Sequence, residues 1–131
     1  EDVRRFFKRA TSDPTGLFEK IHVWVQQTCP GCYCNIRGAL DLFRKEEGLY
    51  EKLIEKYGEV NIIAGGVPDL DVDRMKPSPL FVVGDCWKLF PSKKLVEKAI
   101  EKATKVIYYP GCAPVYIFSQ LYADLVKLAE E

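Results

Sequence analysis

The sequence lacks the residues and charge patterns that mark several common classes of protein. His22 is its only histidine, and no Ser-His-Asp or paired-carboxylate pattern accompanies it, so no hydrolytic site is indicated. Its 19 basic and 19 acidic residues cancel, which argues against the basic face of a nucleic-acid-binding protein. No apolar run approaches the ~20 residues of a membrane span, and the charged residues 1–5 do not resemble a secretory signal. We expect a cytoplasmic protein, at most peripheral to a membrane complex, with no nucleic-acid partner and no direct membrane insertion.

The chain has the length of a single domain. Its 131 residues are enough to bury a core without the help of a metal or a disulfide. Residues 1–18 predict an N-terminal helical extension, with a short helix over residues 2–10 followed by a turn-rich break. Because the sequence begins at Glu1 without methionine, we expect it to be part of a longer protein.

Short apolar runs alternate with stretches of helical periodicity along the rest of the chain. The runs predict strands over residues 21–26, 60–64, 80–83 and 105–109. Helices are predicted after Asn35, over residues 49–57, after Ser92 and from Pro114. Such alternation is typical of an α/β domain with a parallel sheet, and right-handed crossovers leave few topologies. We expect a flavodoxin-like three-layer domain whose four-stranded parallel sheet has the order 2-1-3-4.

Four of the five cysteines follow directly on predicted strands. Cys29 and Cys32 come after the first strand, Cys86 after the third and Cys112 after the fourth. In open α/β sheets, ligands bind outside the carboxyl ends of the strands, where the strand order reverses. A C-x-x-C pair can supply two thiolates from one loop, and the other two cysteines arrive singly, as a 4Fe-4S cluster requires. The sequence therefore predicts one 4Fe-4S cluster held by Cys29, Cys32, Cys86 and Cys112.

The strings around these cysteines resemble a known family. They are C-x-x-C after the first strand, Gly-Asp-Cys at residues 84–86 and Pro-Gly-Cys-Ala-Pro at residues 110–114. Over residues 21–131 the chain resembles the cluster-binding domain of the nickel–iron hydrogenase small subunit and is similar to the 20 kDa subunit of respiratory complex I. The resemblance implies a flavodoxin-like fold with one 4Fe-4S cluster on the same four cysteines.

The chain also departs from that family at two places. Hydrogenase small subunits typically carry an acidic residue after the C-x-x-C pair, whereas residues 33–35 here are Tyr, Cys and Asn. The family continues with small residues after its second string, whereas Trp87, Lys88 and Leu89 follow Cys86. We therefore expect a non-catalytic electron-transfer component of an oxidoreductase complex, and we assign no catalytic residue.

Three alternatives stay open from the sequence. Cys34 could replace Cys32 as a cluster ligand. Cys29 and Cys32 form a C-P-G-C motif, so the chain could be a thiol–disulfide oxidoreductase in which a helix N-terminus lowers the thiol pKa. The cysteines could also bind zinc in an interaction domain, although structural zinc sites usually pair two such knuckles.

The loops expected around the cluster are unusually apolar. They cover residues 29–34, 65–69, 86–90 and 111–114, and they include Tyr33, Val67, Trp87 and Leu89. An exposed apolar patch on a domain usually marks a binding site. We expect a larger redox subunit, or a fused domain of one, to dock there, with Trp87 in the contact.

Overall fold

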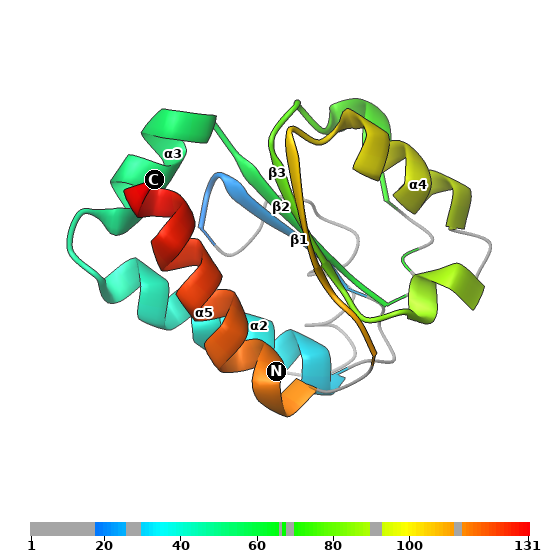
Figure 1. Ribbon diagram of the computed structural model, residues 1–131, viewed down its shortest axis with the longest axis horizontal. Helices are drawn as coiled ribbons and strands as arrows, with labels where there is room; N and C mark the ends of the chain where they lie inside the picture. Colours follow the sequence, from blue (N-terminus) through cyan, green and yellow to red (C-terminus); the bar gives the residue numbers. More distant parts are fainter. Residues whose placement is uncertain (1–17, 26–29, 66, 68–69, 90–92, 112–113) are drawn as a thin grey trace.

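The computed structural model describes residues 18–25, 30–65, 67, 70–89, 93–111 and 114–131 (Figure 1). Its strands are β1 (Ile21–Val25), β2 (Val60–Ala64), β3 (Pro79–Val83) and β4 (Lys105–Tyr109). Its helices are α2 (Pro30–Lys45), α3 (Leu49–Tyr57), α4 (Lys93–Lys102) and α5 (Pro114–Glu130), with 3-10 turns η1 (Val72–Arg74) and η2 (Cys86–Leu89). The predicted α/β fold with a four-stranded parallel sheet is confirmed. The predicted helix over residues 2–10 lies outside the described residues.

The strands form where the apolar runs predict them, but α2 begins earlier than expected. It starts at Pro30 rather than after Asn35, which places Cys32 and Cys34 inside its first turns. Proline is well suited to the first helical position, because its missing N–H would have no intrahelical partner there and its φ is already helical. Gly48, with φ 79°, then separates α2 from α3 by adopting a left-handed conformation that most residues avoid.

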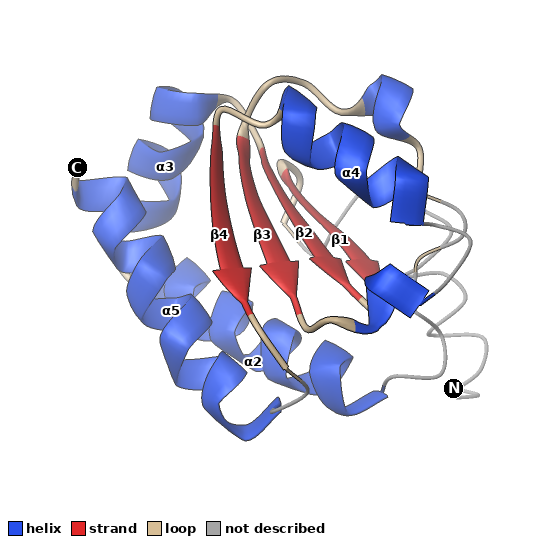
Figure 2. Cartoon of the chain, turned by 45° about the vertical axis from the view of Figure 1, so that its right-hand side comes forward, coloured by secondary structure: helices blue, strands red, loops and turns tan. Residues whose placement is uncertain are grey.

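Helices cover both faces of the sheet (Figure 2). On one face, α2, α3 and α5 pack on β-strand residues that include Val23, Ile62 and Phe81. On the other face, α4 and the segments around η1 and η2 enclose a second apolar cluster that contains Trp24, Leu80, Trp87 and Val96. The result is a three-layer arrangement, as predicted. No described helix is long and apolar enough to cross a membrane.

The order of the strands differs from the predicted 2-1-3-4. The sheet runs β1-β2-β3-β4, with all neighbours parallel. Ile62 of β2 is in register with Val23 of β1 and with Phe81 of β3, so β2 lies between them. The described part of the connection from β2 to β3 contains the three-residue η1 and no crossover helix. In the structure, β3 lies beside β2 after this connection.

The two helical connections run on opposite faces of this sheet. α2 and α3 lead from β1 to β2 on the face that they share with α5, whereas α4 leads from β3 to β4 on the other face. Both connections step to the next strand in the same direction, so they have opposite hands. One of them is therefore of the left-handed kind that parallel β-α-β units rarely adopt.

A buried polar network lies at the amino end of the sheet. Asn61 Nδ2 donates hydrogen bonds to Glu59 Oε2 at 3.0 Å and to Ser78 Oγ at 3.1 Å. Trp24 Nε1 donates to Asn61 Oδ1 at 3.3 Å. His22 Nε2 lies 3.9 Å from Glu59 Oε1, beside a cavity of about 30 Å³. The single histidine is thus at the end of the sheet opposite the carboxyl ends of the strands.

Candidate functional site

Two of the four predicted cluster cysteines lie at the carboxyl end of the sheet, within the described residues. Cys32 is in the first turn of α2 and Cys86 is the first residue of η2, and both are half-buried. Figure 2 shows the arrowheads of all four strands pointing to this end. We call it the cysteine pole: the first turn of α2, residues 84–89 and residues 110–111.

The other two predicted ligands lie outside the described residues, but their neighbours are at the cysteine pole. Cys29 immediately precedes Pro30, the first residue of α2, and Cys112 immediately follows Gly111. Within the residues that the structure describes, no group of three or more Cys, His, Asp or Glu side chains has the geometry of a metal site. Cys34 is exposed.

Asp85 ties together the segments that lead into Cys86 and Cys112. The backbone N–H of Gly111 donates a hydrogen bond of 2.7 Å to Asp85 Oδ2. The N–H of Gly84 donates one of 2.7 Å to the carbonyl of Tyr109. Gly84 and Asp85 are therefore both hydrogen-bonded to the segment that immediately precedes Cys112.

Glycine is required at both sides of this contact. Gly84 and Gly111 each have φ 79°, in the left-handed region that favours glycine. A Cβ atom on Gly84 would lie 3.2 Å from the carbonyl oxygen of Gly111, which is closer than most side chains allow. The two glycines thus let the backbone segments approach one another beside the cysteines.

The Asp85 carboxylate is held in its charged form. The Gly111 N–H, followed by the Lys88 side chain, lowers the pKa of Asp85, and these effects outweigh desolvation, which acts in the opposite direction. Lys88 Nζ lies 3.0 Å from Asp85 Oδ1. An ionised Asp85 keeps both contacts at neutral pH.

Lys88 also lies over two aromatic rings. Its Nζ is 5.6 Å from the centre of the Trp87 ring and 5.3 Å from that of Tyr108, within the range of cation–π attraction. Through Lys88, η2 therefore contacts Asp85 on one side and Tyr108 of β4 on the other. The sequence gives neither Asp85 nor Lys88 a role in the site, although both lie in the strings around Cys86. One sequence signal could have identified Asp85. This residue stands between Gly84 at the end of a strand and Cys86, and a Gly-Cys pair follows the next strand.

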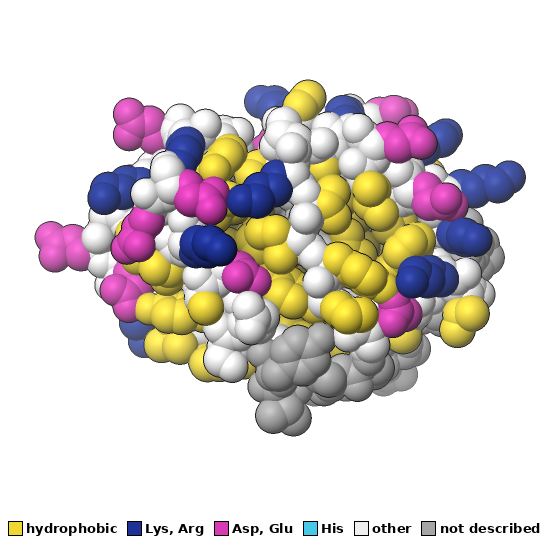
Figure 3. Space-filling view, in the orientation of Figure 1, with side chains coloured by type: hydrophobic (Ala, Val, Ile, Leu, Met, Phe, Trp, Pro, Cys, Tyr) yellow, Lys and Arg dark blue, Asp and Glu magenta, His cyan; other side chains and the backbone are white. Residues whose placement is uncertain are grey.

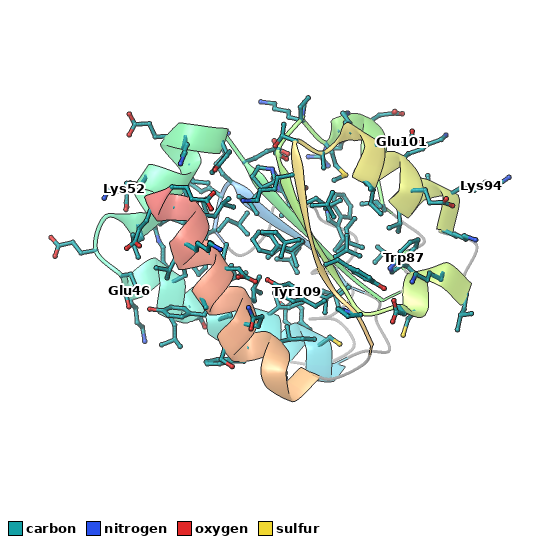
Figure 4. All side chains as sticks on the ribbon, viewed as in Figure 1. Glu46, Lys52, Trp87, Lys94, Glu101 and Tyr109 are labelled. Atoms are coloured by element: carbon teal, nitrogen blue, oxygen red, sulfur yellow. The ribbon has the colours of Figure 1, made fainter. Side chains whose placement is uncertain are left out.

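Of the apolar rim residues predicted for partner docking whose side chains the structure describes, most are buried. Tyr33 is 2% exposed, Val67 1% and Trp87 8%, so these three side chains belong to the core. Figure 4 shows Trp87 between η2 and the sheet. Its ring packs into the cluster beneath α4, so it does not have the exposed position that was expected for a docking residue. Leu89, two residues on, is 87% exposed and is the described rim residue that a partner could reach.

The comparisons with known proteins add no family to these observations. No protein-family model, no curated protein and no solved structure matches the chain. The functional interpretation therefore depends on the cysteine strings and on the geometry of the cysteine pole.

Proposed function

We propose that the protein is an electron-transfer domain or subunit that carries one 4Fe-4S cluster on Cys29, Cys32, Cys86 and Cys112. The main support is the Asp85–Gly111 hydrogen bond of 2.7 Å, which joins the residues directly before Cys86 and Cys112. Cys86 and Cys112 are 26 positions apart in the sequence, yet the backbone segments that lead into them are in contact. Cys32 lies at the same end of the sheet, at the start of α2.

The groups around the cysteine pole suit a cluster with a net negative charge. The N-terminal end of α2, a helix of 16 residues, directs backbone N–H groups and the positive end of its dipole to this edge. The backbone turns at Gly84 and Gly111 present small residues beside Cys86 and Cys112. When bound, the cluster would supply one-electron transfer, and its reduction potential would depend on such hydrogen bonds and on solvent exposure.

The strand order 2-1-3-4 belongs to this proposal. In that order, the helices can keep the faces of the sheet that they cover in the structure. The connections through α2–α3, η1 and α4 are then all right-handed. It also makes β1 and β3 neighbours, about 4.8 Å apart instead of about twice that distance. Cys32 and Cys86, which follow these two strands, would then be close enough to share one cluster.

Backbone NMR distances distinguish the two strand orders. In the order 2-1-3-4, we expect nuclear Overhauser contacts between backbone protons of β1 and β3 and none between β2 and β3. Contacts between Ile62 and Phe81, which are in register in the order β1-β2-β3-β4, would contradict the proposed order. Contacts between β3 and β4 are common to both orders and serve as the control.

Purification without oxygen tests the cluster itself. We expect a brown protein with a broad absorption band near ~400 nm and about four iron atoms per chain, as for a cubane cluster. A colourless protein with bound zinc would instead favour the zinc-stabilised interaction domain. A colourless, metal-free protein with two reactive thiols would favour the dithiol oxidoreductase, because the start of α2 at Pro30 also places Cys32 of the C-P-G-C motif in the first turn of a helix.

The partner in this proposal is a larger redox subunit, or a fused domain, that covers the cysteine pole. An electron can reach a docked protein from a cluster held at the end of a sheet, next to the surface. Leu89, with 87% of its side chain exposed beside Cys86, supplies the apolar contact for such a partner.

A further inference from the structure

The outer edge of β4 is open. β4 pairs with β3 on one side, and within the described part of the chain no strand pairs with its other side. Val106 and Tyr108 are 39% and 40% exposed, so two of the four exposed large hydrophobic side chains of the described residues lie on this one strand. Figure 3 shows hydrophobic side chains gathered along the middle of this face, where Figure 1 places β4 between α5 and α4.

This edge has little protection against pairing. Proteins commonly block an open edge with charged residues, proline or a bulge. Here Lys105 is the only charged residue in β4, and Pro110 lies just after it. The stretch between them is made of β-branched and aromatic residues, which favour strand pairing.

A groove runs beside the edge, between β4 and α5. It has a volume of about 120 Å³ and is lined by Lys105, Ile107, Asp124, Lys127, Leu128 and Glu131. Its middle is apolar, and its charged lining consists of two lysines and two acidic residues. At the carboxyl end of β4, the Asp124 carboxylate accepts a hydrogen bond of 2.7 Å from Tyr109. At the amino end is the Lys105 ammonium, which lies 3.2 Å from Glu131 Oε2.

We propose that β4 pairs antiparallel with β4 of a second copy of the chain, about a two-fold axis at Ile107, so that two sheets become one. In this register Val106 faces the partner's Tyr108, and aromatic side chains opposite β-branched ones stabilise antiparallel pairs. Lys105 faces the partner's Tyr109 and so comes next to the partner's Asp124. The same symmetry operation repeats this contact at the other end of the strand.

Charge complementarity favours a second copy over a strand from another protein. Lys105, which is also paired with Glu131 of its own chain, and Asp124 lie at opposite ends of β4, so a single two-fold rotation brings each next to the other in the partner, as a self-complementary interface requires. A foreign strand would have to supply an acidic and a basic group independently, in the right places. This inference does not depend on the cluster, because β4 is an edge strand in both strand orders considered above.

Sedimentation velocity of the full chain, in reductant and from ~1 to ~300 µM, tests the proposal across the range of Kd expected for a small interface. The expected result is a concentration-dependent dimer. Val106→Lys should stay monomeric over the same range, because it replaces the β-branched partner of Tyr108 with a charged residue of the kind that blocks pairing at open sheet edges. Leu42→Lys is the matched control, since Leu42 is 41% exposed on α2, away from β4, and this variant should dimerise like the parent.

A charge exchange tests the register. Lys105→Glu should raise the dimer Kd on the order of tenfold, because a carboxylate then faces the partner's Asp124. Combining it with Asp124→Lys should restore the parent Kd. A parent chain that stays monomeric at every concentration, or a Val106→Lys variant that dimerises normally, would overturn the proposal. Failure of the double variant to recover would overturn the register.

Discussion

Cys86→Ser and Cys112→Ser should each remove most of the iron from the protein. A hydroxyl is a poorer iron ligand than a thiolate, so each change leaves one corner of the proposed cluster weakly held. The Asp85–Gly111 hydrogen bond holds together the segments that lead into Cys86 and Cys112. Because the two cysteines are proposed to bind the same cluster, loss of either thiolate should have the same effect. Iron per chain and absorbance near ~400 nm, measured after anaerobic purification, report the result directly.

Cys34→Ser is the matched control for this experiment. Cys34 is exposed and lies two residues beyond Cys32 in α2, so the two side chains project from different sides of the helix. Only one of them can face the cysteine pole. The variant should keep its iron. If Cys34→Ser loses the iron and Cys32→Ser retains it, the ligand assigned within α2 is wrong.

Trp87→Glu should destabilise the fold severely. Trp87 is 8% exposed and packs in the cluster that also contains Leu80 and Val96. Truncating a buried tryptophan typically costs about 3–5 kcal/mol, and a buried carboxylate without a partner adds a desolvation cost. We expect a large fall in the midpoint of thermal unfolding, or an insoluble protein. Unfolding followed by circular dichroism measures it.

Leu89→Glu is the variant that separates docking from folding. Leu89 is 87% exposed, so its replacement should change the free energy of unfolding by no more than about 0.5 kcal/mol. Its iron content should stay at the parent value while association with the proposed redox partner weakens. Normal association of Leu89→Glu would rule out a docking contact at η2. A Trp87→Glu protein as stable as the parent would contradict the burial of that ring.

The positions of the strands could be predicted because they depend on local sequence. The apolar run in β2 and the Pro-flanked run in β4 are bounded by residues that end strands, so their limits are recognisable without tertiary information. The start of α2 was missed because Pro30 and Gly31 look like a turn. Proline, however, is as favourable at the first position of a helix as it is in a turn.

Burial at the cysteine pole could not be predicted in the same way, because it depends on which segments meet in space. Trp87 and Leu89 are neighbouring apolar residues in the sequence, yet one lies under α4 and the other points to solvent. Nothing within η2 itself distinguishes them. The Asp85–Gly111 contact likewise joins residues that are far apart in the chain, and only the approach of the two loops shows it.

The buried Asn61 favours one alignment of β2 with β1. Purely aliphatic strands can slide past one another with little penalty, because one valine or isoleucine replaces another in the core. A slip of one residue would turn the Asn61 amide to the opposite face of the sheet, among Val23, Ile36 and other aliphatic side chains. There it would lose its contacts with Trp24, Glu59 and Ser78, and an unsatisfied buried amide costs about 1–3 kcal/mol. A polar residue at the amino end of the sheet thus acts against misaligned pairing while the chain folds.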